Sequence, residues 1–231
     1  MEEGKFFVAP KANLIIFARM KNIRRTFFHF LLFGLGVCIP RVMAESIPST
    51  QFTSEKLTLE EHFHAGRYEA GFGGGSLFSP IGRPKNRPTV NYAFGEFHFG
   101  LMLTDPGGPG ILRGNLELVP EAFGAAIYDG PGNYVAGGAA WFRYNFIPPD
   151  WRVIPYVQAG GGAVLTDIDH RYVGQHFNFN LGAAAGLRFF VCPHSTVNLE
   201  YRFQHISNAN LGPRNIGINA HGPALSFSRL F

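Results

Sequence analysis

The sequence predicts an all-β fold, an eight-stranded antiparallel β-barrel that spans a membrane. Of its 231 residues, 15% are aromatic and only 16% are charged, which leaves little polar material for the surface of a soluble domain. After the N-terminal region no run of about 18 apolar residues occurs, so spanning helices are not expected there. Eight alternating segments follow instead, and a closed barrel satisfies all backbone hydrogen bonds within a bilayer.

Residues 1–44 are organised as an N-terminal extension followed by a secretory signal peptide. A basic cluster at 21–25 precedes the apolar run 27–38, and a small-residue cleavage site ends at Ala44. The apolar run is short for a membrane anchor, the alternative interpretation. Translation could start at Met1 or at Met20. We predict cleavage near Ala44 and an integral protein of the bacterial outer membrane.

The basic character of the chain belongs mostly to this leader. The leader holds seven Lys and Arg residues against two acidic ones, so its removal changes the formal charge from +4 to 13 minus 14, or −1. Nucleic acid binding is therefore not expected. Cys38 leaves with the leader and Cys192 remains alone, which excludes an intramolecular disulfide in the mature chain.

A polar segment, 45–67, precedes the barrel region, 68–231, where strand-like segments recur between turn residues. We expect the strands near 68–77, 90–104, 112–128, 133–146, 153–167, 175–191, 196–208 and 220–231. An even number suits an up-and-down barrel with both ends on one side. With the N-terminus in the periplasm, the connections after the odd-numbered strands lie outside the cell.

The clearest alternation is in the sixth segment. Phe177, Phe179 and Leu181 share one face, while Asn178 and Asn180 share the other. A soluble lipocalin would place its apolar face inward. The polar faces here carry Asn, Gln, Glu and Arg, so we predict the inverted arrangement, with apolar residues toward lipid.

The polar faces also predict what fills the barrel. Glycines at 71–75 and 160–162 would relieve crowding inside a narrow lumen. Aromatic residues near strand ends, Tyr156 among them, fit interfacial girdles or ordinary strand propensity. A network of lumenal charges is expected, and a proton or solute path is the alternative; its members would be Glu96, His98, Glu117, Arg143, Arg188, Glu200 and Arg202.

A histidine and a serine stand two residues apart near the outer end of the seventh strand. His205 and Ser207 share the face of Tyr201 and Phe203. A serine hydroxyl needs an adjacent base, and imidazole can take its proton at neutral pH. This spacing is also common by chance, and from the pattern alone a polar strand end at the headgroup boundary is the more frequent explanation.

The run Tyr201–Ala209 reads YRFQHISNA and is followed by Asn215, Gly217 and Asn219. These roughly thirty C-terminal residues resemble the PagL-type lipid A 3-O-deacylases and the wider acyloxyacyl hydrolase family. The resemblance implies an eight-stranded barrel whose site faces the outer leaflet and hydrolyses the ester-linked acyl chain at position 3 of lipid A. It implies that Ser207 is the nucleophile and His205 the general base.

The resemblance extends to three asparagines. Asn208 and Asn215 match residues that would help hold the oxyanion or position the substrate. Asn219 aligns with a glutamate that, in the family's best-known members, orients the histidine and stabilises its imidazolium. Asparagine can orient an imidazole but contributes no negative charge, so its presence could slow the reaction by orders of magnitude and puts the activity in question.

The predicted function is thus a serine esterase acting on lipid A of lipopolysaccharide, in contact with outer-membrane lipids, without cofactor or metal. A non-catalytic barrel that is structural or binds lipid or a partner is one alternative, and a phospholipase-like esterase is another. A homodimer is a further possible assembly that the sequence does not decide. His62 and His64 could bind a metal, but two histidines without a third ligand are more often solvated.

Overall fold

The computed structural model describes residues 60–81, 85–149 and 151–231. The predicted extension and signal peptide, 1–44, lie outside the described residues, as do positions 45–59 of the polar segment. No helix in the three described ranges is long and apolar enough to cross a membrane.

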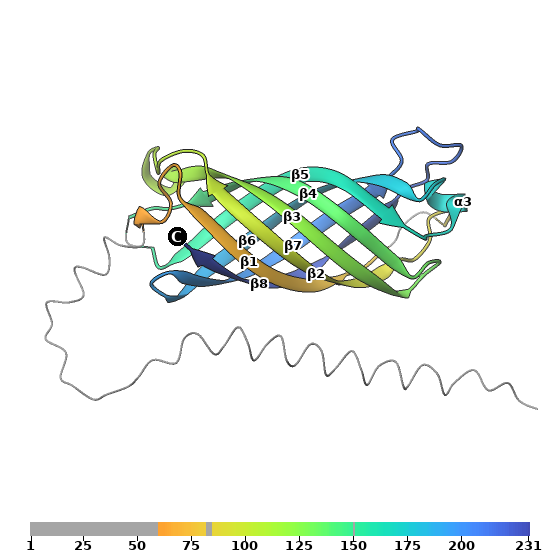
Figure 1. Cartoon of the computed structure of the whole chain (residues 1–231), viewed down its shortest axis with the longest axis horizontal. Helices are drawn as coiled ribbons and strands as arrows, with labels where there is room; N and C mark the ends of the chain where they lie inside the picture. The colour runs from red at the N-terminus through yellow and green to blue at the C-terminus, as the bar shows by residue number, and fades with distance from the viewer. Residues whose placement is uncertain (1–59, 82–84, 150) are drawn as a thin grey trace, which may run out of the picture. The chain divides into compact units, whose positions relative to one another are not determined.

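The predicted fold is confirmed, because eight antiparallel strands close into a barrel in which each strand pairs with its neighbour in sequence (Figure 1). The first and last strands pair to close it. Every strand begins and ends within two residues of the predicted position. The strands are β1 (Tyr68–Leu77), β2 (Asn91–Met102), β3 (Gly114–Asp129), β4 (Tyr134–Phe146), β5 (Val153–Thr166), β6 (Phe177–Cys192), β7 (Ser195–Ser207) and β8 (Ile218–Leu230). A 3-10 turn, η1 (Gly110–Leu112), and a short helix, α3 (His170–Val173), lie in connections.

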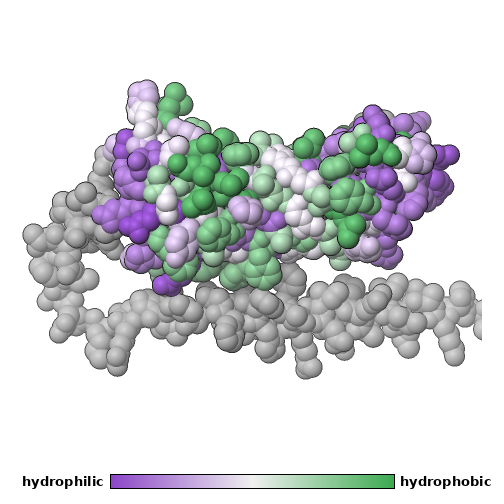
Figure 2. Space-filling model, turned by 45° about the horizontal axis from the view of Figure 1, so that its top comes forward, coloured by the Kyte–Doolittle hydropathy of each residue, from purple (hydrophilic) through white to green (hydrophobic). Residues whose placement is uncertain are grey.

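The outer face is apolar, as the alternation predicts. Along β2 and β6 alternate side chains face outward and are exposed or half-buried, and the exposed ones include Phe97, Phe99, Phe177 and Leu181. On the face shown in Figure 2, apolar residues cover much of the middle of the barrel, and hydrophilic residues gather at its two ends. This distribution is that of a barrel whose middle faces lipid.

The predicted network of lumenal charges is confirmed, with two carboxylates that the sequence analysis missed. Glu69 forms an ion pair with Arg188, whose Nη1 lies 2.8 Å from the carboxylate, and it accepts hydrogen bonds from Arg143 Nη1 at 3.0 Å and Arg188 Nη2 at 3.2 Å. Glu121 binds the guanidinium of Arg202 through two contacts of 2.9 Å. Both carboxylates stand on the inward face of their strands, so alternation alone could have identified them.

Tyr156 belongs to this interior rather than to an interfacial girdle. Its side chain is buried, and its hydroxyl donates to Glu200 at 2.9 Å. The girdle assignment is wrong for Tyr156 because the residue has the inward parity of Ile154 and Gln158 on β5.

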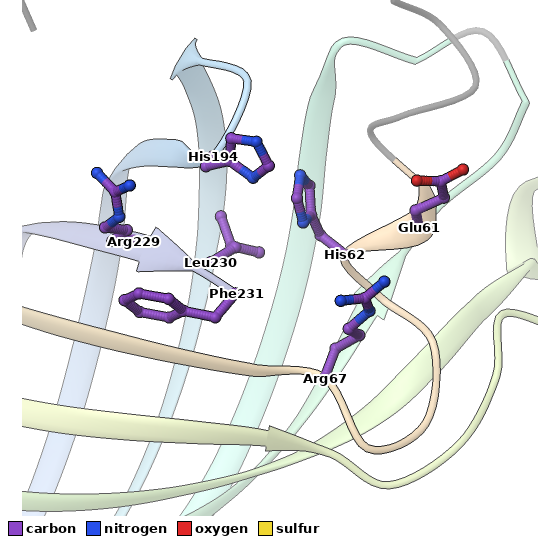
Figure 3. Close-up of a pocket in the computed structure, with 7 residues that line it drawn as sticks. All are labelled: Glu61, His62, Arg67, His194, Arg229, Leu230 and Phe231. Atoms are coloured by element: carbon purple, nitrogen blue, oxygen red, sulfur yellow. The ribbon is translucent and has the colours of Figure 1, made fainter.

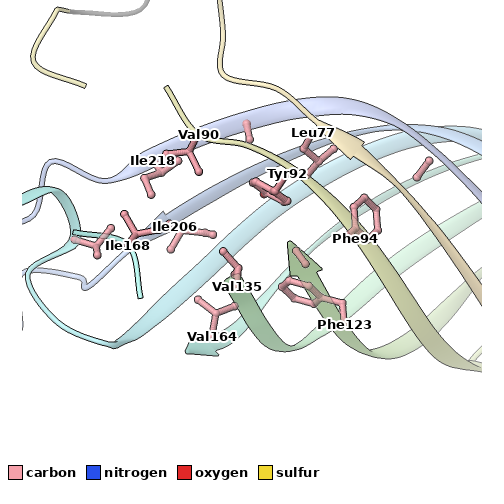
Figure 4. Packing of buried hydrophobic residues seen from close by; sticks show 14 residues of the cluster. Leu77, Val90, Tyr92, Phe94, Phe123, Val135, Val164, Ile168, Ile206 and Ile218 are labelled. Atoms are coloured by element: carbon pink, nitrogen blue, oxygen red, sulfur yellow. The ribbon is translucent and has the colours of Figure 1, made fainter. Parts of the chain in front are cut away.

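Apolar side chains close the lumen on both sides of the charges. At the end toward α3, Tyr92, Phe94, Phe123 and Ile206 belong to a cluster of fourteen buried residues (Figure 4). At the other end Phe63, part of the predicted polar segment, is fully buried beside Phe190. A polar path for protons or solutes would have to cross these layers, so the structure favours a filled barrel.

Glycines make room for this packing, as expected. A Cβ atom at Gly71 would lie 2.3 Å from His98 Nε2, and one at Gly182 would lie 2.6 Å from Trp141 Cη2. Neither approach is sterically allowed, so the large interior side chains depend on these two positions.

Candidate functional site

The predicted site residues meet at one end of the barrel, where β7 and β8 are joined by the loop 208–217. His205 pairs directly with Asn219 across the two strands. His205 and Ser207 are half-buried on the outer face, whereas Ile206 between them is buried in the interior cluster. The strand period therefore places both candidate catalytic side chains on the lipid-facing side.

His205 has an orienting partner. The side-chain amide of Asn219 and Nδ1 of His205 lie 2.6 Å apart and form a hydrogen bond. The bond leaves Nε2 as the ring nitrogen available to a serine or a substrate. A non-catalytic barrel would not need such a partner for this histidine.

Ser207 is close to this histidine, although within the described part of the chain no hydrogen bond joins the two side chains. Gly217 shows their proximity, since a Cβ atom there would lie 3.0 Å from His205 Cε1 and 3.5 Å from Ser207 Cβ. Both side chains therefore border the small space that Gly217 leaves open. Catalytic hydrogen bonds are often absent before substrate binds, so this geometry is compatible with a Ser–His pair.

The side chain of Asn208 holds the loop 208–217 in place through hydrogen bonds. This side chain is fully buried, and Nδ2 donates to the carbonyls of Val173 at 2.9 Å and Arg214 at 2.8 Å. Its Oδ1 accepts from the Asn210 backbone N–H at 2.9 Å. These bonds tie the loop to the end of α3, and they occupy the amide that was expected to face an oxyanion.

Asn215 supports the same loop. Its Oδ1 accepts from the backbone N–H of Asn208 at 3.0 Å, and its Nδ2 donates to Asn210 Oδ1 at 2.9 Å. Ala209 and Asn210 have φ angles of 53° and 62°, so the chain reverses in the left-handed region directly after the serine. Within the described residues the Ala209 N–H has no hydrogen-bond partner, and it follows Ser207 by two residues in the sequence.

The surroundings of the site are apolar, and one polar pair interrupts them. Leu181 and Phe203 are exposed on the outer face next to His205. His221 Nδ1 and the Tyr201 hydroxyl form a hydrogen bond on the same face. His221 was not among the predicted site residues, although its parity with Asn219 on β8 could have identified it.

The loops at this end carry three basic side chains that have no carboxylate partner among the described residues. Burial raises the pKa of Asp167, but hydrogen bonds from Asn133 and Tyr134 outweigh it and lower the pKa below its ordinary value. Asp169 is neutralised by Arg171 at 2.7 Å. Lys85, Arg87 and Arg214, by contrast, form no salt bridge with any described residue.

A pocket of about 300 Å³, lined among others by His62, His194 and Phe231 (Figure 3), lies at the end of the barrel where β7 begins, opposite to the end that carries Ser207. His62 and His194 meet there with ring centroids 4.6 Å apart. Burial lowers the pKa of His62, and His194 lowers it further. His62 is thus buried rather than solvated.

His64 bonds instead to Asp105 at 2.9 Å, so the two histidines of the sequence motif do not converge. No group of three or more His, Cys, Asp or Glu side chains suited to a metal ion occurs in the described ranges.

The profile of the lipid A 3-O-deacylase (PagL) family matches residues 110–228, from η1 to β8, and includes His205, Ser207 and Asn219. The chain belongs to the PagL family. This confirms the resemblance seen in the sequence. No curated protein matches the chain.

Solved structures share the barrel. The outer membrane enzyme PagL aligns with 70% of this chain and 98% of its own, at 19% identity and a TM-score of 0.49. Neisserial surface protein A aligns with 72% of this chain and 98% of its own, at 15% identity and a TM-score of 0.50. OprG from Pseudomonas aeruginosa aligns with 74% and 98%, at 12% identity and a TM-score of 0.41. Identities this low are informative about the fold alone.

Proposed function

We propose that this PagL-family chain is an outer-membrane serine esterase that hydrolyses the 3-O-linked acyl chain of lipid A in lipopolysaccharide. The observation that carries the proposal is the outward placement of Ser207 beside a histidine held by Asn219, within the part of the chain that matches the family. An ester buried among acyl chains can reach a nucleophile only from the lipid side of a barrel.

The reaction divides into two acyl transfers. His205 takes the Ser207 proton while Oγ attacks the ester carbonyl carbon, and the tetrahedral intermediate expels the sugar 3-oxygen, which receives that proton from the imidazolium. Water then attacks the acyl-serine with the same histidine as base, releasing a free fatty acid and restoring the serine. Neither step needs a metal or an organic cofactor.

The oxyanion of the intermediate requires hydrogen-bond donors. The free N–H of Ala209 is suitably close in sequence to Ser207, and the N–H of Asn208 becomes a second donor once it releases Asn215. On this proposal Asn208 and Asn215 position the loop backbone, and the backbone supplies the donors.

The cellular setting follows from the surface of the barrel. The apolar middle of the barrel lies in the membrane, and the loops with Lys85, Arg87 and Arg214 face the anionic headgroups of the outer leaflet. The signal peptide is removed near Ala44 and the chain end at Phe231 stays in the periplasm. In this orientation Ser207 is at the depth of the outer leaflet.

The test is release of fatty acid from purified lipopolysaccharide, followed by mass spectrometry of the lipid A product. Ser207→Ala should lower the rate by about 10³-fold or more, since the nucleophile is lost. Ser76→Ala is the matched control, because this serine lies near the same end of the barrel and bonds to Tyr128 rather than to His205. A Ser207→Ala protein that releases fatty acid at the unmodified rate refutes the proposal.

Two other functions give different results in the same assay. A phospholipase-like esterase would release fatty acid from phospholipid faster than from lipid A, again dependent on Ser207. A non-catalytic barrel, which the missing Ser207–His205 hydrogen bond and the uncharged Asn219 favour, would release none from either substrate.

A further inference from the structure

The side chain of Asn219 lies between two others. One end of its amide is 2.6 Å from His205 Nδ1, and the other is 2.8 Å from Arg87 Nη1. Arg87 belongs to the connection between β1 and β2, which the family profile does not cover. No motif or spacing in the sequence associates Arg87 with the histidine.

The neighbours of the amide decide which way it points. A guanidinium can only donate hydrogen bonds, so the atom that faces Arg87 must be the oxygen. The NH₂ group then faces His205 Nδ1 and also donates to the Ile218 carbonyl at 3.2 Å. The reverse orientation sets two donors against each other at Arg87 and loses the bonds to Arg87 and to the Ile218 carbonyl, keeping only the one between Oδ1 and His205 Nδ1.

This orientation fixes the tautomer of the ring. A nitrogen that accepts a hydrogen bond carries no hydrogen, so neutral His205 keeps its hydrogen on Nε2. A base for Ser207 needs the lone pair on Nε2 and the hydrogen on Nδ1 instead. Resting on the proposed function, we infer that Arg87 is a positioning residue which, through Asn219, holds His205 in the tautomer that cannot accept the serine proton.

The effect of Arg87 on the tautomer of His205 depends on the side chain at position 219 being an amide. A carboxylate there has no donor, so it can accept from Arg87 and from His205 Nδ1–H together. Arg87 would support the catalytic tautomer beside a glutamate, whereas beside Asn219 it opposes it. The effect of removing Arg87 should therefore change sign with the residue at 219.

The experiment compares the unmodified chain with Arg87→Met, Asn219→Glu and the double variant, in micelles with purified lipopolysaccharide. Arg87→Met alone should raise kcat by about tenfold or more, because a hydrogen bond to a charged group no longer holds the amide. Together with Asn219→Glu, the same substitution should leave kcat unchanged or lower it. Lys85→Met removes an equal charge from the same connection without touching Asn219, and should not raise kcat.

Other outcomes would overturn the inference. If Arg87 only anchors its loop, Arg87→Met lowers kcat in both backgrounds. If Arg87 only binds substrate, Arg87→Met raises KM and leaves kcat unchanged.

The tautomer itself can be measured without activity, by ¹⁵N NMR of histidine-labelled protein with His205→Gln to assign the signal. We expect hydrogen on Nε2 in the unmodified chain and on Nδ1 after Arg87→Met. Hydrogen on Nδ1 in the unmodified chain would overturn the inference whatever the rates. Loss of the proposed function would show separately, as equal rates with and without Ser207→Ala.

Discussion

Gly217→Ala tests whether His205 and Ser207 work as a pair. Gly217 has a φ of +70°, and an alanine in this left-handed region lowers the free energy of unfolding by about 1–2 kcal/mol. Its new Cβ would also lie 3.0 Å from His205 Cε1, closer than the 3.5–4.0 Å at which carbon atoms pack. The ring or the loop must therefore move by roughly 0.5 Å to clear that contact.

A displacement of this size at a reacting group should lower the rate by about 10- to 100-fold, since a misplacement of about 1 Å can cost 10²-fold. Gly66→Ala is the matched control. Gly66 has a φ of +85°, and a Cβ there meets nothing within 4 Å. Both variants should lose about 1–2 kcal/mol of unfolding free energy, but only Gly217→Ala should lose activity.

The measurements are urea unfolding in micelles, followed by tryptophan fluorescence, and fatty-acid release from lipopolysaccharide. Equal rates for the two variants would show that Gly217 does not border a working catalytic pair. A much larger loss of stability in Gly217→Ala would instead mean that the loop cannot relax around the added methyl group.

Two further predictions concern the barrel and its outer loops. Asp167→Asn should lower the free energy of unfolding at neutral pH by about 1 kcal/mol. Because the pKa of Asp167 is lowered in the folded chain, the carboxylate stabilises the fold fully above its ordinary pKa of 3.8, and this stabilisation is lost as the pH falls through the lowered pKa. Urea unfolding should therefore give the same stability for the variant and the unmodified protein in acid. Glu121→Ala should lower the free energy of unfolding by about 3 kcal/mol or more in the same measurement, since it removes the carboxylate that binds both Nη atoms of the buried Arg202 guanidinium. A loss below about 1 kcal/mol would contradict a structural role for that ion pair.

Alternation was sufficient to predict the barrel because a strand has a period of two. Knowing that Phe179 and Leu181 face lipid fixes the inward direction of Asn178 and Asn180, and the strand limits follow from turn residues between the segments. The same rule placed His205 and Ser207 on the outer face.

The rest depended on contacts between distant segments. Phe63 could not be recognised as a plug, because one apolar residue among polar ones has no period. The buried bonds of Asn208 to Val173 and Arg214 join two loops whose conformations carry no local pattern. Arg87 meets Asn219 only because β1 closes the barrel against β8.

Ile206 separates two kinds of evolutionary constraint along one strand. Its inward side chain belongs to the packing that keeps the barrel folded, while the residues on either side face outward and lie outside that cluster. A lineage could therefore lose or retune its chemistry at 205, 207 and 219 with little effect on folding. In proteins built this way, inheritance of the fold is a weaker guide to turnover than the identity of three outward-facing side chains.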